Sequence, residues 1–81
     1  MAKNNGEFTF EIIEHICDLS DTTEKVWTKE LNIVSWNGGK PKADIRDWDE
    51  DHTHCGKGAT LTSAECDVLY DGLEKLAKHK F

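Results

Sequence analysis

Apolar and polar residues alternate in two stretches of the chain, and this alternation predicts β-strands. In residues 7–17, phenylalanine and isoleucine alternate with threonine and glutamate, so one face of the strand is apolar. The consecutive residues Ile12 and Ile13 interrupt the alternation, which indicates a β-bulge. The polar segment at residues 18–24 then predicts a connecting loop.

The second strand, predicted at residues 25–37, carries large apolar residues on both faces. Leu31 and Ile33 share one face, which we expect to point to the core, and Trp27 on that face is predicted to make a core or dimer contact. Trp36 falls on the opposite face unless a bulge changes the register. We therefore expect a large exposed ring, which requires a functional explanation.

A hairpin turn and a third strand follow. The segment Asn37–Pro41 contains Asn-Gly and Gly-Gly, which favour a tight turn with positive φ. In the strand predicted at residues 42–48, Ile45 points inward, whereas Arg46 and Trp48 point outward together. The hairpin is thus expected to present one surface that bears two tryptophans and an arginine.

The C-terminal part predicts a loop, a short edge strand and a helix. Residues 49–58 are acidic and end in glycine, and residues 59–61 are long enough only for an edge strand. Thr62 and Glu65 form a capping box at the start of a helix that we expect to run to about residue 79. Helical spacing produces an apolar stripe of Cys66, Leu69, Leu73, Leu76 and Ala77. The fold class is α+β, an antiparallel β-β-β-β sheet followed by and backed by one helix.

Length and cysteine content limit the organisation of the chain. Its 81 residues predict one domain, residues 1–81, of which residues 1–6 are expected to be disordered. A monomer of this size can bury only about 60–65% of the surface of its unfolded chain and would be marginally stable, and a dimer interface would bury more. The three cysteines form no C-x-x-C pair and favour a reducing compartment. Neither a secretory signal nor a membrane segment is predicted, so we expect a cytoplasmic protein, a location compatible with association with the nucleoid.

The charge is distributed unevenly along the chain. The net charge is -6, but residues 25–46 contain five basic and two acidic residues. Local charge steers a polyanion more than total charge does. Exposed rings among positive charges are typical of surfaces that bind single-stranded nucleic acid. The candidate binding residues are Lys29, Asn32, Ser35, Trp36, Lys40, Lys42, Arg46 and Trp48; the asparagine and serine are expected to bond either backbone or bases.

Other chemistry is weakly indicated. The Asp47-x-Asp49-x-Asp51 run lacks the glycine and glutamate of a calcium loop. His52, His54 and Cys55 match no standard zinc spacing, and no pocket or orienting group is evident for a cysteine–histidine nucleophile. We expect no enzymatic activity, no metal and no cofactor.

Two ordered motifs resemble a known family. These are Asp-Ile-Arg-Asp-Trp at residues 44–48 and Gly-Lys-Gly-Ala-Thr-Leu-Thr at residues 56–62, followed by a helix. They are similar to the single-stranded-DNA-binding domain of the transcriptional coactivator positive cofactor four. The segment from Trp27 to Asn37, followed by Pro-Lys and Asp-Ile-Arg, resembles the bacterial YdbC-like branch. The resemblance covers about residues 7–77.

The resemblance implies a homodimer of curved four-stranded sheets that binds single-stranded DNA with little sequence preference. Trp36 matches an aromatic residue that stacks on bases, and Arg46 matches the arginine of the Asp-Ile-Arg run. Trp48 matches the aromatic that follows this run, where the eukaryotic branch has two aromatics. Lys57 matches the lysine of the Gly-Lys-Gly turn.

Two alternative functions remain open from the sequence. Stacking and phosphate contacts tolerate either sugar, so the same surface would suit single-stranded RNA. A protein-interaction module, in which the acidic first segment and loop recruit a basic partner, is the alternative from another class. Transcription regulation and support of DNA repair or replication are equally compatible with DNA binding.

Overall fold

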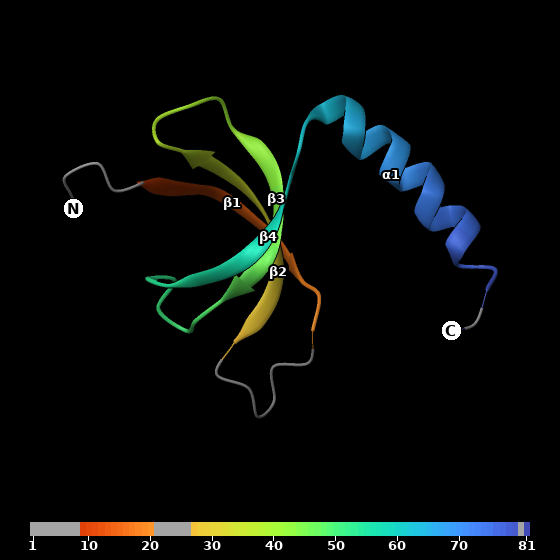
Figure 1. The fold of residues 1–81 in the computed structure, drawn as a ribbon, viewed down its shortest axis with the longest axis horizontal. Coiled ribbons are helices and arrows are strands. Elements are labelled where there is room, and N and C mark those ends of the chain that lie inside the picture. The colour runs from red at the N-terminus through yellow and green to blue at the C-terminus, as the bar shows by residue number, and fades with distance from the viewer. Residues whose placement is uncertain (1–8, 21–26, 80) are drawn as a thin grey trace.

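The computed structural model describes residues 9–20, 27–79 and 81, and its elements follow the predicted order (Figure 1). The strands pair antiparallel in the order β1-β2-β3-β4, so the predicted fold class of a four-stranded sheet followed by one helix is confirmed. The expectations for residues 1–6, and for most of the loop at residues 18–24, lie outside the described residues. The elements are β1 (Phe10–Asp18), β2 (Thr28–Trp36), β3 (Lys42–Trp48), β4 (Cys55–Leu61) and α1 (Ser63–Leu76).

Two element boundaries differ from the prediction. β4 begins at Cys55, inside the segment predicted to be a loop, because its Gly-Lys-Gly sequence has no apolar alternation that would reveal a strand. Gly58 pairs with Arg46, and a Cβ at this glycine would overlap the Ile45 carbonyl oxygen and the Arg46 side chain. The helix ends at Leu76 rather than near residue 79.

The local backbone signals are confirmed. β1 has a register shift between Ile12 and Glu14, where a bulge was predicted, and a second shift between His15 and Cys17 that was not. In the turn after β2, Asn37 has φ 53° and Gly38 has φ 73°. The Gly39 N–H donates to the Trp36 carbonyl oxygen at 2.9 Å, which closes a tight hairpin turn of the type that suits twisted strands.

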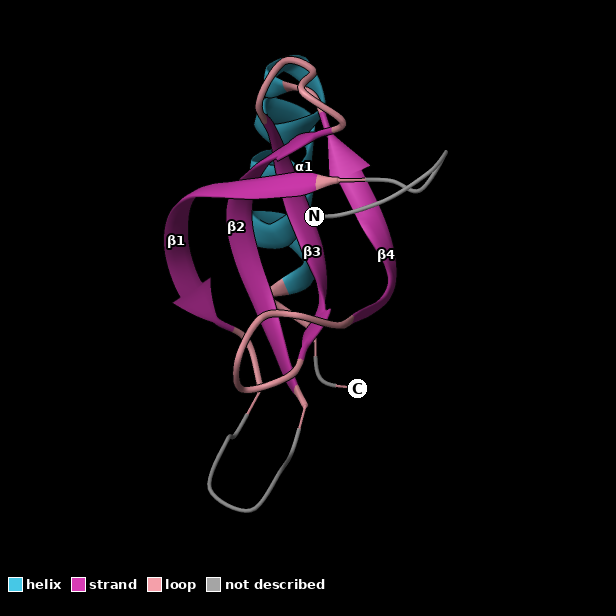
Figure 2. Ribbon diagram, turned by 90° about the vertical axis from the view of Figure 1, so that its left-hand side faces the viewer, coloured by secondary structure: helices cyan, strands magenta, loops and turns pink. Residues whose placement is uncertain are grey.

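The core lies on the face opposite to the predicted one. The sheet is strongly curved (Figure 2), and its inner face, which bears Val34, Trp36, Arg46 and Trp48, encloses the buried side chains. Val34 and Trp48 are the fully buried hydrophobic residues of the described chain. The sequence predicted the wrong core face because the curvature of the sheet, which brings side chains from different strands together on the inner face, does not follow from the alternation within one strand. Leu31, Ile33 and Ile45, which were expected to face the core, are only half-buried on the outer face.

Helix α1 projects away from the sheet instead of backing it (Figure 1). The predicted capping box is present: the Glu65 N–H donates to the Thr62 hydroxyl, and the Thr62 N–H donates to the Glu65 carboxylate. No residue of the helix is buried, and Leu73, in the middle of the apolar stripe, is 50% exposed. Within the described residues, no helix combines the length and apolar character needed to cross a membrane.

Candidate nucleic-acid interface

Trp36 lies at the end of β2, where the hairpin turn begins, and is half-buried. Its ring is nearly parallel to that of Trp48, with centroids 6.3 Å apart and planes inclined by 12°. Phe10, which pairs with Trp36 in the sheet, contacts both rings, at centroid distances of 5.7 Å and 5.0 Å. Packing of this kind fixes the orientation of Trp36.

Arg46 covers a face of the Trp36 ring, and its guanidinium carbon lies 4.5 Å from the ring centroid. Two charge-assisted hydrogen bonds hold the guanidinium against the buried Asp44 carboxylate, Nε–Oδ1 at 2.7 Å and Nη2–Oδ2 at 2.8 Å. Thr60 also donates to Asp44, at 3.1 Å. Burial by itself lowers the pKa of Arg46, but its hydrogen bonds to Asp44 and the charge of Asp44 outweigh this and raise the pKa. The arginine is therefore a fixed, permanent cation beside the ring.

A shallow hollow of about 300 Å³ opens over this pair of side chains. Trp36, Asn37, Arg46 and Thr60 line it, so an aromatic ring, a cation and two polar side chains meet at one place. The Asn37 side-chain oxygen accepts from the Thr9 N–H at 2.7 Å, which holds the turn against the start of β1. A flat, polar-edged group such as a nucleobase fits this combination.

The four predicted lysines are all exposed, but they do not form one cluster. Lys42 pairs with Val34 and so lies on the inner face, and Lys40 lies in the turn beside it. Lys29 pairs with Asp47 on the outer face. Lys57 lies on β4 at the register shift between the Arg46–Gly58 and Trp48–Cys55 pairs. The structure therefore brings two of the predicted lysines to the end of the sheet that bears Trp36.

Three predicted site residues are buried in this chain. Trp48, expected to be exposed beside Arg46, is fully buried, because the curvature that joins Trp36 to Arg46 also covers Trp48 with Phe10. The Ser35 hydroxyl donates to the Gly39 carbonyl oxygen at 2.7 Å, the backbone role that was one of its two expected roles. Asn32 is fully buried among polar side chains. These residues position the surface.

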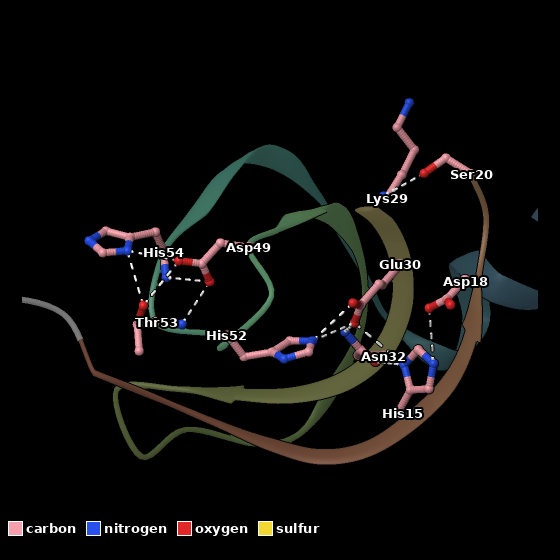
Figure 3. Close-up of polar contacts among 10 residues, drawn as sticks. All are labelled: His15, Asp18, Ser20, Lys29, Glu30, Asn32, Asp49, His52, Thr53 and His54. Carbon is pink, nitrogen blue, oxygen red and sulfur yellow. Dashed lines mark hydrogen bonds and ion pairs between the residues drawn. The ribbon is translucent and has the colours of Figure 1, made fainter. Parts of the chain in front are cut away.

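The sequence did not indicate a second group of polar side chains, on β1 and β2 and in the β3–β4 loop (Figure 3). Asn32 donates to Glu30 at 3.0 Å, His15 contacts Asn32 at 2.7 Å, and His52 contacts Glu30 at 2.9 Å. His15, Glu30 and His52 are far apart in the sequence, so no spacing pattern could have linked them. The sequence did contain one sign of this group: Glu30 lies an even number of positions from Trp36 in β2, so the two side chains share a face.

His52 and His54 do not converge, although they are close in the sequence. The His54 imidazole contacts Asp49 at 2.9 Å, whereas His52 reaches Glu30 (Figure 3). Desolvation raises the pKa of Asp49, but hydrogen bonds from His54 and Thr53 outweigh it and lower that pKa well below its ordinary range. Asp49 therefore stays ionised and organises the loop.

Trp27, just before β2, is 42% exposed. It is therefore not a core residue of the described chain. Its expected dimer contact stays a prediction.

Comparison with known proteins supports the resemblance seen in the sequence. The family described as Transcriptional Coactivator p15 (PC4), which is positive cofactor four, matches residues 23–72. An uncharacterized protein of Treponema pallidum (strain Nichols) is 41% identical over 73 residues, which are 90% of this chain and 85% of that protein. At the level of the family, the matched proteins bind single-stranded DNA and act in transcription coactivation. The matched segment holds β2, β3, β4 and most of α1, including the Trp36–Arg46 pair, and the chain belongs to the transcriptional coactivator p15 (PC4) family.

Proposed function

We propose that this protein binds single-stranded DNA without sequence preference, through base stacking at Trp36 and neutralisation of phosphates by nearby cations. The observation that carries the proposal is the hollow in which Arg46 lies against the Trp36 ring. Stacking on an aromatic ring is tolerant of sequence, because every base has a π-face. We propose that the activity serves transcription regulation or the support of DNA repair and replication in the cytoplasm.

The binding surface is narrower than the sequence indicated. Trp36, Lys40 and Lys42 lie at the turn end of the hairpin, and the Arg46 side chain reaches the Trp36 ring from the second half of β3, where Arg46 pairs with Glu30. Trp48 packs nearly parallel to the Trp36 ring. Lys29 lies on the outer face, so in one chain it contacts DNA only if the strand passes around the edge of the sheet. Lys57 lies on the edge strand β4, away from the hairpin turn. We therefore assign the primary contacts to Trp36, Arg46, Lys40 and Lys42, and phosphate contacts at longer range to Lys29 and Lys57.

We also propose that the protein acts as a homodimer. The outer face offers Leu31, Ile33 and Ile45, all half-buried, and α1 offers an uncovered stripe that includes Leu73 and Leu76, 50% and 43% exposed. Apolar surface of this extent on a small chain favours association. One chain has only a small core, and we propose that a second copy of the chain covers these apolar surfaces.

A titration of a fluorescently labelled oligo-dT at several salt concentrations tests DNA binding. We expect anisotropy to report binding at low salt, and log affinity to fall linearly with log salt, by about 0.7 for each phosphate neutralised. The absence of binding at low salt would reject the proposal. An RNA oligomer of equal length is the comparator, and tighter binding of RNA would reassign the substrate.

Light scattering tests the dimer. We expect a mass twice the 9.2 kDa of one chain, and a shift to the monomer mass in Leu73→Glu, because a charge would enter the apolar stripe. Lys75→Glu introduces the same side chain on the opposite side of the helix and should leave the dimer intact. A monomer at micromolar concentration in the unmodified protein would contradict this architecture.

A further inference from the structure

The hollow over Trp36 and Arg46 contains one side chain whose hydrogen-bond donors the chain itself does not use. Asn37 directly follows β2, lines the hollow together with Trp36, Arg46 and Thr60, and is exposed to solvent. Its backbone has φ 53°, a conformation that asparagine adopts more readily than most residues. The hairpin turn thus places a short polar side chain at the rim of the hollow.

Two hydrogen bonds to Thr9 fix the orientation of the Asn37 amide group. The Asn37 backbone N–H donates to the Thr9 carbonyl oxygen at 2.7 Å, and the Thr9 N–H donates to Asn37 Oδ1, also at 2.7 Å. The side-chain atom that faces Thr9 must be the oxygen, because a backbone N–H needs an acceptor. The amide nitrogen is on the other branch of the side chain and therefore faces away from Thr9. No described residue accepts a hydrogen bond from it.

The other polar side chains of the hollow are already engaged in hydrogen bonds. Arg46 donates through Nε and Nη2 to Asp44, and through Nη1 to the Gly56 carbonyl oxygen at 3.3 Å. The Thr60 hydroxyl donates its hydrogen to Asp44. Arg46 and Thr60 are thus held by Asp44, whereas both side-chain N–H groups of Asn37 stay available to a molecule in the hollow.

The bases differ in what they present to such a donor. Thymine and guanine carry a carbonyl oxygen at the position where cytosine and adenine carry an amino group. An amide N–H pairs with the carbonyl oxygen, whereas two amino groups that face each other leave donors without acceptors. Unpaired bases that stack on an aromatic ring or a guanidinium are recognised through edge hydrogen bonds of this kind. One amide group at the rim therefore suffices to distinguish two classes of base.

We propose that Asn37 recognises the edge of the base held at Trp36 and Arg46, and that its amide group favours thymine and guanine over cytosine and adenine. This preference depends on the proposed binding of single-stranded DNA and acts at one nucleotide. Strands of most sequences still bind, because a flexible strand shifts until a favoured base reaches the hollow. The preference is therefore one of base composition and requires no ordered sequence motif.

Anisotropy titrations with labelled oligo-dU and oligo-dC of equal length test the preference. The two bases have the same size, and uracil carries a carbonyl group where cytosine carries its amino group. At slightly alkaline pH, where cytosine is unprotonated, we expect oligo-dU to bind about 2- to 10-fold more tightly, the effect of one net hydrogen bond. Equal affinities would overturn the preference and leave the proposed DNA binding intact, whereas the absence of binding to both oligomers would reject both proposals.

Asn37→Asp distinguishes recognition of the base from a structural role in the turn. Aspartate keeps an oxygen for the Thr9 N–H and tolerates the positive φ, but it replaces the N–H donors by an acceptor. We expect both affinities to fall because of the added negative charge. We also expect their order to reverse, because a carboxylate accepts from the cytosine amino group. A loss of equal size for the two oligomers would contradict the assignment.

Lys40→Gln is the matched control for the change of charge. Lys40 is exposed in the same turn, so its replacement should weaken the binding of both oligomers by the same factor. The ratio of the two affinities should then equal that of the unmodified protein. A ratio that changes as much in Lys40→Gln as in Asn37→Asp would show that charge, rather than the amide group, sets the preference. Circular dichroism verifies that both variants are folded.

Discussion

Replacement of Asp44 by alanine is expected to lower the free energy of unfolding by about 3–5 kcal/mol. Asp44 is fully buried and makes two hydrogen bonds to Arg46, whose side chain is only 15% exposed. Removal of the carboxylate leaves an unpaired guanidinium in a largely dehydrated position and deprives Thr60 of its acceptor. Urea denaturation followed by tryptophan fluorescence measures the loss.

The matched control for this substitution is Asp47→Ala. Asp47 lies on the same strand but on the outer face, where it pairs with Lys29 in the sheet. Asp47 is half-buried, whereas Asp44 is fully buried. Replacement of Asp47 should therefore change the free energy of unfolding by no more than about 1 kcal/mol, because a charge that still reaches solvent contributes little. Equal losses in the two variants would show that the Asp44–Arg46 pair does not stabilise the fold.

The second large effect is expected on DNA affinity in Trp36→Leu. Loss of a stacked base costs about 1–3 kcal/mol, which corresponds to about 5- to 150-fold weaker binding of oligo-dT. Leucine keeps an apolar side chain against Phe10 and Trp48 but removes the π-face. Trp36→Phe retains a smaller ring and should lose less affinity. Anisotropy titrations, with unfolding measured in parallel, separate binding from stability.

Trp27→Leu serves as the control for the loss of an exposed tryptophan. Trp27 precedes β2 and is 42% exposed, at the opposite end of the strand from Trp36. We expect its DNA affinity to match that of the unmodified protein. Unchanged affinity in Trp36→Leu, in a variant as stable as the parent, would eliminate stacking at this position.

The sequence predicted strand order and the sharing of faces well, because both follow from local periodicity and turn chemistry. β3 has the predicted bounds, and Trp36, Arg46 and Trp48 do share one face. Which face holds the core could not be deduced, because it depends on the curvature of the whole sheet. The predicted length of β4 was too short, because its first half contains glycines and shows no apolar alternation. Gly58 is needed there because the strand packs closely against Arg46, a constraint that periodicity does not reveal.

Part of the candidate site was also predictable. Trp36 and Arg46 were singled out by residue type, and the structure brings them together. The residues that hold Arg46 in place were not predicted. Asp44 accepts hydrogen bonds from Arg46 and Thr60, and the bond from Thr60 forms only once β3 and β4 pair. The same holds for His15, Glu30 and His52, which come together only when β1, β2 and the β3–β4 loop are folded.

The two register shifts in β1 also have a consequence for solubility. β1 is an outermost strand of the sheet, and such a strand offers backbone groups on which strands of other molecules can pair. The shifts next to Ile13 and Ile16 interrupt the regular row of donors and acceptors and twist the strand. Both isoleucines are nearly half exposed, at 47% and 46%, and would make an unbroken edge prone to aggregation. The irregular backbone of β1 therefore keeps these sheets from growing by strand addition at this edge.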